Sequence, residues 1–140
     1  MELPPILMLL ASAIVLCLGS AHLLYTFRGA KLLPRDPQAI DAMKASTLGI
    51  TKDTTVWKAW IGFNASHSMG AMLFGLVFGY LAVVSPALLF GSLFLQGIGF
   101  AMLLGFLALG WLYWFSVPFT GIAVATAFYV ASIGWVQLAS

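Results

Sequence analysis

The sequence predicts an all-α membrane protein, an up-down bundle of four transmembrane helices in a single domain over residues 1–140. Of its 140 residues, 62% are hydrophobic and 7% are charged, whereas soluble domains are about half apolar and a quarter charged. All charged residues except Glu2 lie between Arg28 and Lys58. Residues 59–140 contain no Asp, Glu, Lys or Arg, which leaves room for three uninterrupted spans. This composition excludes a soluble enzyme, a nucleic-acid-binding protein and a disulfide-rich secreted scaffold.

Four apolar segments are each long enough to cross a bilayer, which takes about 20 residues. We expect them at residues 5–27, 54–84, 87–114 and 119–138. Only helices or closed barrels satisfy the backbone in lipid, and runs this long without alternation indicate helices. Pro86 and Pro118 mark the two breaks after the second and third spans, and the short connections there favour antiparallel neighbours.

The first span raises the question of a signal peptide and of a reactive thiol. It has Glu2 in place of a basic leader, so we expect a retained helix. Cys17, the single cysteine, excludes an intrachain disulfide, and we expect it to be a small buried apolar side chain.

A long loop over residues 28–53 separates the first two spans. Asp36 followed by Pro37 predicts an N-capped short helix over residues 37–46. Asp53 precedes the expected start of the second span at Thr54, so we predict that its carboxylate caps that helix.

All six Lys and Arg residues lie in the segment 28–58. Basic residues in short loops stay in the cytoplasm, so we expect a cytoplasmic loop 28–53 and both termini outside. The segment 28–58 carries six basic and three acidic residues, an excess of three positive charges. These charges either only determine topology or also contact anionic lipid headgroups.

Apart from Lys58 near the start of the second predicted span, two histidines are the only Asp, Glu, Lys, Arg or His side chains in the predicted spans. His22 lies six residues before Arg28, and His67 lies seven residues after Trp60. At 1.5 Å per residue both imidazoles are about 9 to 10 Å from the same interface, so we expect them at similar depth. Small or polar residues share their helix faces, as is usual for faces inside a bundle. The candidate binding residues are His22, Tyr25, Asn64, His67, Ser68 and Thr126.

Three interpretations of this polar cluster remain open. Neutral imidazoles could hydrogen-bond across helices and set their packing. The cluster could form a pocket for a quinone, a sterol or a lipid headgroup. His22 and His67 could also be the axial ligands of a haem, the one metal site that the sequence allows.

Catalysis has little support in the sequence. A serine nucleophile or a metal hydrolase needs carboxylates or further histidines in the spans, and the sequence has none there. Only the histidines could serve a membrane enzyme that acts on a lipid. We therefore expect a non-enzymatic accessory, structural or assembly subunit of a membrane complex, with a binding protein for haem, quinone or lipid as the alternative. The partners expected are the lipid bilayer and other membrane subunits, not nucleic acid.

The spacing of Gly75 and Gly79 predicts a close helix contact, which we expect to be within the chain rather than between copies.

Two stretches resemble the signature segments of a family of small, uncharacterised bacterial membrane proteins with four spans. They are His22-Leu-Leu-Tyr-Thr-Phe-Arg28 and the segment 56–70, which reads VWKAWIGFNASHSMG. The resemblance implies a four-helix protein of the bacterial inner membrane. It implies no activity and no catalytic role for any residue.

Overall fold

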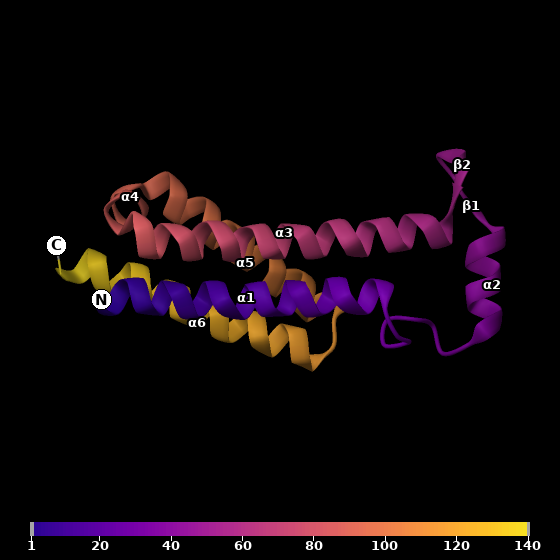
Figure 1. The fold of residues 1–140 in the computed structure, drawn as a ribbon, viewed down its shortest axis with the longest axis horizontal. Helices are drawn as coiled ribbons and strands as arrows, with labels where there is room; N and C mark the ends of the chain where they lie inside the picture. The colour runs from indigo at the N-terminus through magenta and orange to yellow at the C-terminus, as the bar shows by residue number, and fades with distance from the viewer. Residues whose placement is uncertain (1, 140) are drawn as a thin grey trace. The chain divides into compact units, whose positions relative to one another are not determined.

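The computed structural model describes residues 2–139, which form helices and one short hairpin (Figure 1). The elements in chain order are α1 (Leu3–Phe27), α2 (Pro37–Ala45), β1 (Thr47–Leu48), β2 (Thr51–Thr55), α3 (Val56–Val84), α4 (Pro86–Gly91), α5 (Leu93–Tyr113) and α6 (Ser116–Ala139). Within the described residues, the four helices α1, α3, α5 and α6 are long and apolar enough to cross a membrane. The prediction of a mainly helical protein with four helices that could span a membrane is therefore confirmed.

The chain divides into two compact units, each of which is described separately. Unit 1 consists of Met1–Leu18 with Ala71–Ser140, and unit 2 consists of Gly19–Gly70. The helices α1 and α3 each contribute one part to each unit.

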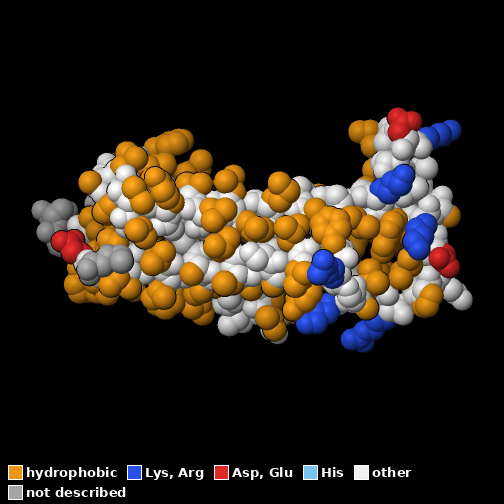
Figure 2. Space-filling model, in the orientation of Figure 1, with side chains coloured by type: hydrophobic (Ala, Val, Ile, Leu, Met, Phe, Trp, Pro, Cys, Tyr) orange, Lys and Arg blue, Asp and Glu red, His pale blue; other side chains and the backbone are white. Residues whose placement is uncertain are grey.

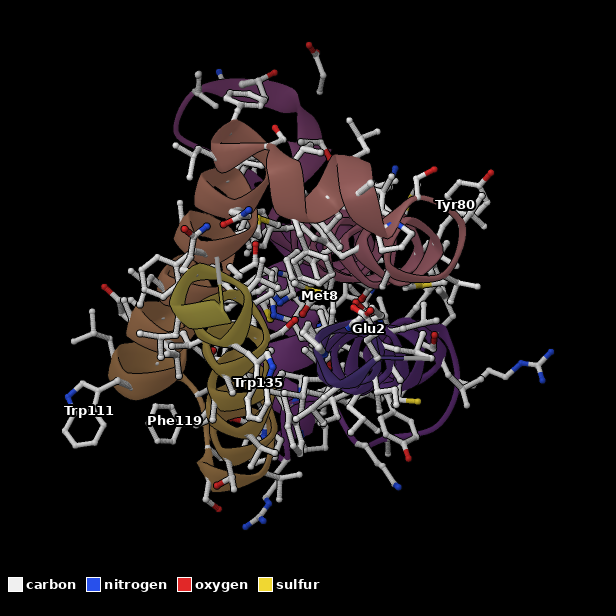
Figure 3. The ribbon with its side chains drawn as sticks, turned by 90° about the vertical axis from the view of Figure 1, so that its left-hand side faces the viewer. Glu2, Met8, Tyr80, Trp111, Phe119 and Trp135 are labelled. Carbon is white, nitrogen blue, oxygen red and sulfur yellow. The ribbon has the colours of Figure 1, made fainter. Side chains whose placement is uncertain are left out.

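An aromatic cluster at the centre of unit 1 joins α3, α5 and α6. The rings of Phe74 and Phe78 stack at 4.6 Å, and Phe78 meets the buried Tyr129 edge-on at 5.8 Å. The Tyr129 hydroxyl donates to the carbonyl of Gln96 at 2.8 Å. Met8 of α1 points into the same unit, whereas Tyr80 and Trp111 point outward (Figure 3). The core of this unit therefore consists of apolar packing around a tyrosine whose hydroxyl is satisfied.

Glycine permits a very close approach of α1 and α3 in unit 1. A Cβ added at Gly75 would lie 2.7 Å from the carbonyl oxygen of Ser12 and 2.7 Å from the Cβ of Leu16. At Gly79 the nearest atom to an added Cβ is the Cβ of Ser12, at 3.4 Å. The two glycines thus serve a contact within the chain, as their spacing predicts.

The prediction of one continuous helix over residues 87–114 is wrong, because this segment forms two helices, α4 and α5. The structure breaks it at Ser92, whose backbone is extended, with φ −106° and ψ 103°, and whose hydroxyl accepts from the amide of Leu95 at 3.3 Å. The side chain of Gln96 donates across the break to the carbonyl of Phe90 at 2.7 Å. The Ser92 hydroxyl caps a new helix, and this bond competes with the backbone hydrogen bonds that would continue the first one. A hydropathy pattern contains no information on such a bond.

Cys17 is exposed in the structure, so the expectation of a buried thiol is wrong. The physical reason is that a lipid-facing helix surface accepts a small apolar side chain as readily as a protein core does. Large hydrophobic side chains such as Trp111, which is 77% exposed, also lie on the outside of unit 1. Hydrophobic side chains cover much of this unit on the face drawn in Figure 2.

In unit 2 the short loop helix is confirmed. α2 begins after Asp36, whose carboxylate accepts from the amide of Gln38 at 2.9 Å, and Pro37 occupies the first turn. Its last residue, Ala45, lies one residue before the predicted end at residue 46.

The prediction that Asp53 caps the next helix is wrong. Asp53 lies in β2 of a two-stranded antiparallel hairpin, where its carboxylate accepts from the hydroxyl of Thr51 at 3.1 Å. The helix α3 begins at Val56, and the hydroxyl of Thr55 accepts from the amide of Lys58 at 3.3 Å. The β-branched threonines favour extended backbone, which delays the helix start beyond Thr54.

The tight contact at Gly75 provides a test of the packing in unit 1. We expect Gly75→Val to lower the free energy of unfolding by about 2 to 3 kcal/mol or to prevent folding, because the new side chain meets helix backbone that cannot move aside. The measurement is denaturation in mixed detergent micelles, followed by circular dichroism. Gly105→Ala is the matched control, because nothing lies within 4 Å of a Cβ added there. Equal stability of the two variants would contradict this packing.

Candidate functional site

The predicted polar residues of the first two spans meet within unit 2. His22 lies near the end of α1, and Asn64 and His67 lie one turn apart on α3. The centroids of the two imidazole rings are 5.5 Å apart, with the planes at 76°. The similar depth that the helix arithmetic predicts for the two histidines is thus observed. We call His22, Asn64 and His67 the His–Asn cluster.

One hydrogen bond joins α1 to α3 inside this cluster. Nε2 of His22 lies 3.0 Å from Oδ1 of Asn64, and Nδ2 of Asn64 donates to the carbonyl of Trp60 at 2.8 Å. A carbonyl only accepts, so the nitrogen of the Asn64 amide must face Trp60 and its oxygen must face His22. An amide oxygen also only accepts, and therefore Nε2 of His22 carries the proton. The cluster thus selects one imidazole tautomer.

Two hydroxyl groups next to the cluster bond to the helix backbone. Thr26 donates to the carbonyl of His22, and Ser68 donates to the carbonyl of Asn64, each at 2.8 Å. Both are bonds to the preceding helical turn, and both side chains are buried. They satisfy polar groups on the turns that carry the cluster. Thr26 was not among the predicted binding residues, although it shares the helix face of His22.

Tyr25 bonds to a loop cation and not to an imidazole. Its hydroxyl accepts from Nζ of Lys31 at 3.0 Å, and the same ammonium group lies 4.2 Å from the centre of the ring. Tyrosine near a helix end with a basic partner is typical of the membrane interface.

The last predicted site residue, Thr126, belongs to unit 1. It is buried in α6, where its hydroxyl donates to the carbonyl of Ile122 at 2.8 Å. Its hydrogen bond therefore stays within its own helix.

The arrangement of the two imidazoles does not fit a haem between them. Axial ligation requires two ring nitrogens that approach one iron from opposite faces of a porphyrin. Here the rings are in edge-to-face contact and Nε2 of His22 is bonded to Asn64. A macrocycle would have to break this bond and separate the helices.

The hydroxyl groups beside His67 lack the geometry of a catalytic nucleophile. Ser66 donates to the carbonyl of Phe63 at 3.0 Å, and Ser68 donates to that of Asn64. A serine nucleophile is activated by a hydrogen bond to a base that is itself oriented by a third group. Among residues 2–139 there is also no group of three or more His, Cys, Asp or Glu side chains placed to hold a metal ion. What the cluster shows directly is a hydrogen bond between α1 and α3.

A double-mutant cycle tests the bond between His22 and Asn64. We expect His22→Phe and Asn64→Leu each to destabilise the protein, with a coupling energy of about 0.6 kcal/mol and at most about 1.7 kcal/mol, the range for hydrogen bonds between helices in membranes. The free energies of unfolding in mixed micelles give this coupling. Ser66→Ala is the control, since its exposed hydroxyl bonds only locally, and it should show no coupling to His22→Phe. Independent effects of His22→Phe and Asn64→Leu would show that the bond does not form.

Comparison with known proteins adds no further assignment. No protein-family model, no curated protein and no solved structure matches this chain. The resemblance of the segments 22–28 and 56–70 to a four-span bacterial family therefore stays a prediction. The function proposed below is based on the residues and their contacts alone.

Proposed function

We propose that this chain is a non-enzymatic accessory or structural subunit of a membrane complex. The main support is that four candidate residues hydrogen-bond to each other or to helix carbonyls: His22, Asn64, Ser68 and Thr126. The bond between His22 and Asn64 joins α1 to α3 and holds these two helices in register. The scaffold role therefore accounts for the polar residues without a substrate.

We further propose that the four spans form an up-down bundle. Contacts within unit 1 support this arrangement for α5 and α6, because Gly110 lies against Phe119 while Gln96 bonds to Tyr129. For α1 and α6, the hydroxyl of Ser132 donates to the carbonyl of Pro4 at 2.7 Å. Each pair joins residues from opposite halves of their helices, as antiparallel neighbours do.

The exposed hydrophobic surface supports a role as a partner for other membrane helices. Large side chains on the outside of unit 1 include Phe94 and Tyr113, each 75% exposed. Lipid or the helices of another subunit must cover this surface. A small protein with so much apolar surface is suited to fill a position at the edge of a larger assembly.

For the orientation, we propose that the loop 28–53 is cytoplasmic and that both termini lie outside, in the bacterial inner membrane. The support is that every Lys and Arg lies in the segment 28–58. Positively charged loops are retained on the cytoplasmic side during insertion.

The accessory role is tested on the tagged chain in its native membranes. After solubilisation in mild detergent, we expect the chain on a native gel to migrate in an assembly with at least one other subunit in fixed stoichiometry. The purified chain, run alone, is the size control. The proposal is contradicted if the solubilised chain carries no other subunit but holds a small molecule in stoichiometric amount, and if His22→Phe abolishes binding of that molecule. This result would favour the ligand-binding alternative.

The orientation is tested by labelling single cysteines in a Cys17→Ser background. We expect Ser46→Cys, after α2, to react with a membrane-impermeant maleimide in inverted vesicles but not in intact spheroplasts. Ser85→Cys is the matched control, because it lies between α3 and α4 and should show the reverse pattern. Labelling of Ser46→Cys in intact spheroplasts would refute a cytoplasmic loop.

A further inference from the structure

The basic residues of unit 2 form an exposed set without acidic partners. The six residues are Arg28, Lys31, Arg35, Lys44, Lys52 and Lys58. All six are exposed, and within residues 2–139 none of them forms an ion pair. The Lys and Arg side chains lie over this unit among hydrophobic ones (Figure 2). A set of unpaired cations in one unit leaves its positive charge available to an external anion.

The carboxylates of the same unit are largely occupied by local hydrogen bonds. Asp36 caps α2, and Asp53 accepts from Thr51 within the hairpin, which leaves Asp41. With six basic and three acidic residues, this segment has a net charge of +3. Asp36 and Asp53 therefore stabilise a local cap and a local turn, and the segment keeps an excess of positive charge.

Aromatic rings position two of these cations. Nζ of Lys31 lies on Tyr25, and Nζ of Lys44 lies 5.7 Å from the ring of Trp57. Trp57 in turn stacks on Trp60 at 5.7 Å and 17°. Trp and Tyr prefer the headgroup region of a bilayer. Since Trp57 and Trp60 lie in the first turns of the candidate span α3, we expect the cations beside them at the level of the lipid headgroups.

Apolar side chains accompany the cations on the loop elements. Ile50, in the turn of the hairpin, is 91% exposed, and the next basic residue is Lys52. Ile40 and Met43 of α2 are only half-buried, and the helix has no buried residue. Exposed apolar groups next to cations are characteristic of segments that lie in the bilayer interface.

We propose that unit 2 binds the headgroups of anionic phospholipids in the membrane that the chain occupies. The cations meet the lipid phosphates, and exposed apolar residues such as Ile50 meet the upper acyl region. The apolar residues favour a lipid over a free phosphate, because a phosphate ion offers them no contact. This inference goes beyond the accessory role and does not depend on it.

The test measures lipid selectivity of the full chain in bilayers of phosphatidylcholine. Spin-labelled phosphatidylglycerol and spin-labelled phosphatidylcholine report, by electron spin resonance, the relative association of each lipid with the protein. We expect the ratio of phosphatidylglycerol to phosphatidylcholine association to be clearly above one. At about 1 M salt, where the screening length is about 3 Å, this ratio should fall toward one. The triple variant Lys31→Gln, Lys44→Gln, Lys52→Gln should lower this preference by about fivefold or more.

The matched control replaces the same three lysines by arginine, which keeps the charge, and should retain the preference. Inorganic phosphate at matched ionic strength should leave it unchanged. The proposal is overturned if the wild-type chain shows no preference, if the glutamine variant keeps it while remaining folded by circular dichroism, or if inorganic phosphate abolishes it.

Discussion

The need to satisfy polar groups inside apolar helices is the constraint on which this structure depends. In lipid, water does not compensate an unpaired donor or acceptor, so each must find a partner in the protein. Thr26, Ser68 and Thr126 meet this need with a carbonyl in the preceding turn. His22 and Asn64 meet it by bonding across two helices. Within residues 2–139 the hydroxyl of Ser12 is the one buried side-chain polar group without a partner, and Ser12 lies against Gly75 and Gly79 of α3.

Close packing is the second requirement, because hydrophobicity does not drive apolar helices together in lipid. Gly75 brings the backbone of α3 against that of α1, and Gly99 leaves room for the rings of Phe78 and Tyr129. The aromatic side chains supply contact area, and the glycines determine where it forms. The stability of unit 1 therefore depends on shape complementarity.

Charge is separated from these apolar contacts. The cations and three of the four acidic residues lie in the segment 28–58. There they surround a capped helix, a threonine-rich hairpin and a tryptophan pair, elements suited to a bilayer surface. The polar cluster joins α1 to α3. The basic residues, in our proposal, present positive charge to lipid phosphates.

The sequence by itself determined the class of protein, three of the four span boundaries to within three residues, the loop helix and the similar depth of His22 and His67. These features follow from hydropathy, from an Asp-Pro capping signal and from the rise of a helix, which are all local. Only the tertiary structure decided the break at Ser92, the exposed side of Cys17, the hairpin before α3 and the choice of Asn64 as the partner of His22. Lipid and protein core are both apolar, so hydropathy cannot show which way a helix is rotated. Rotation depends on contacts between segments far apart in the chain.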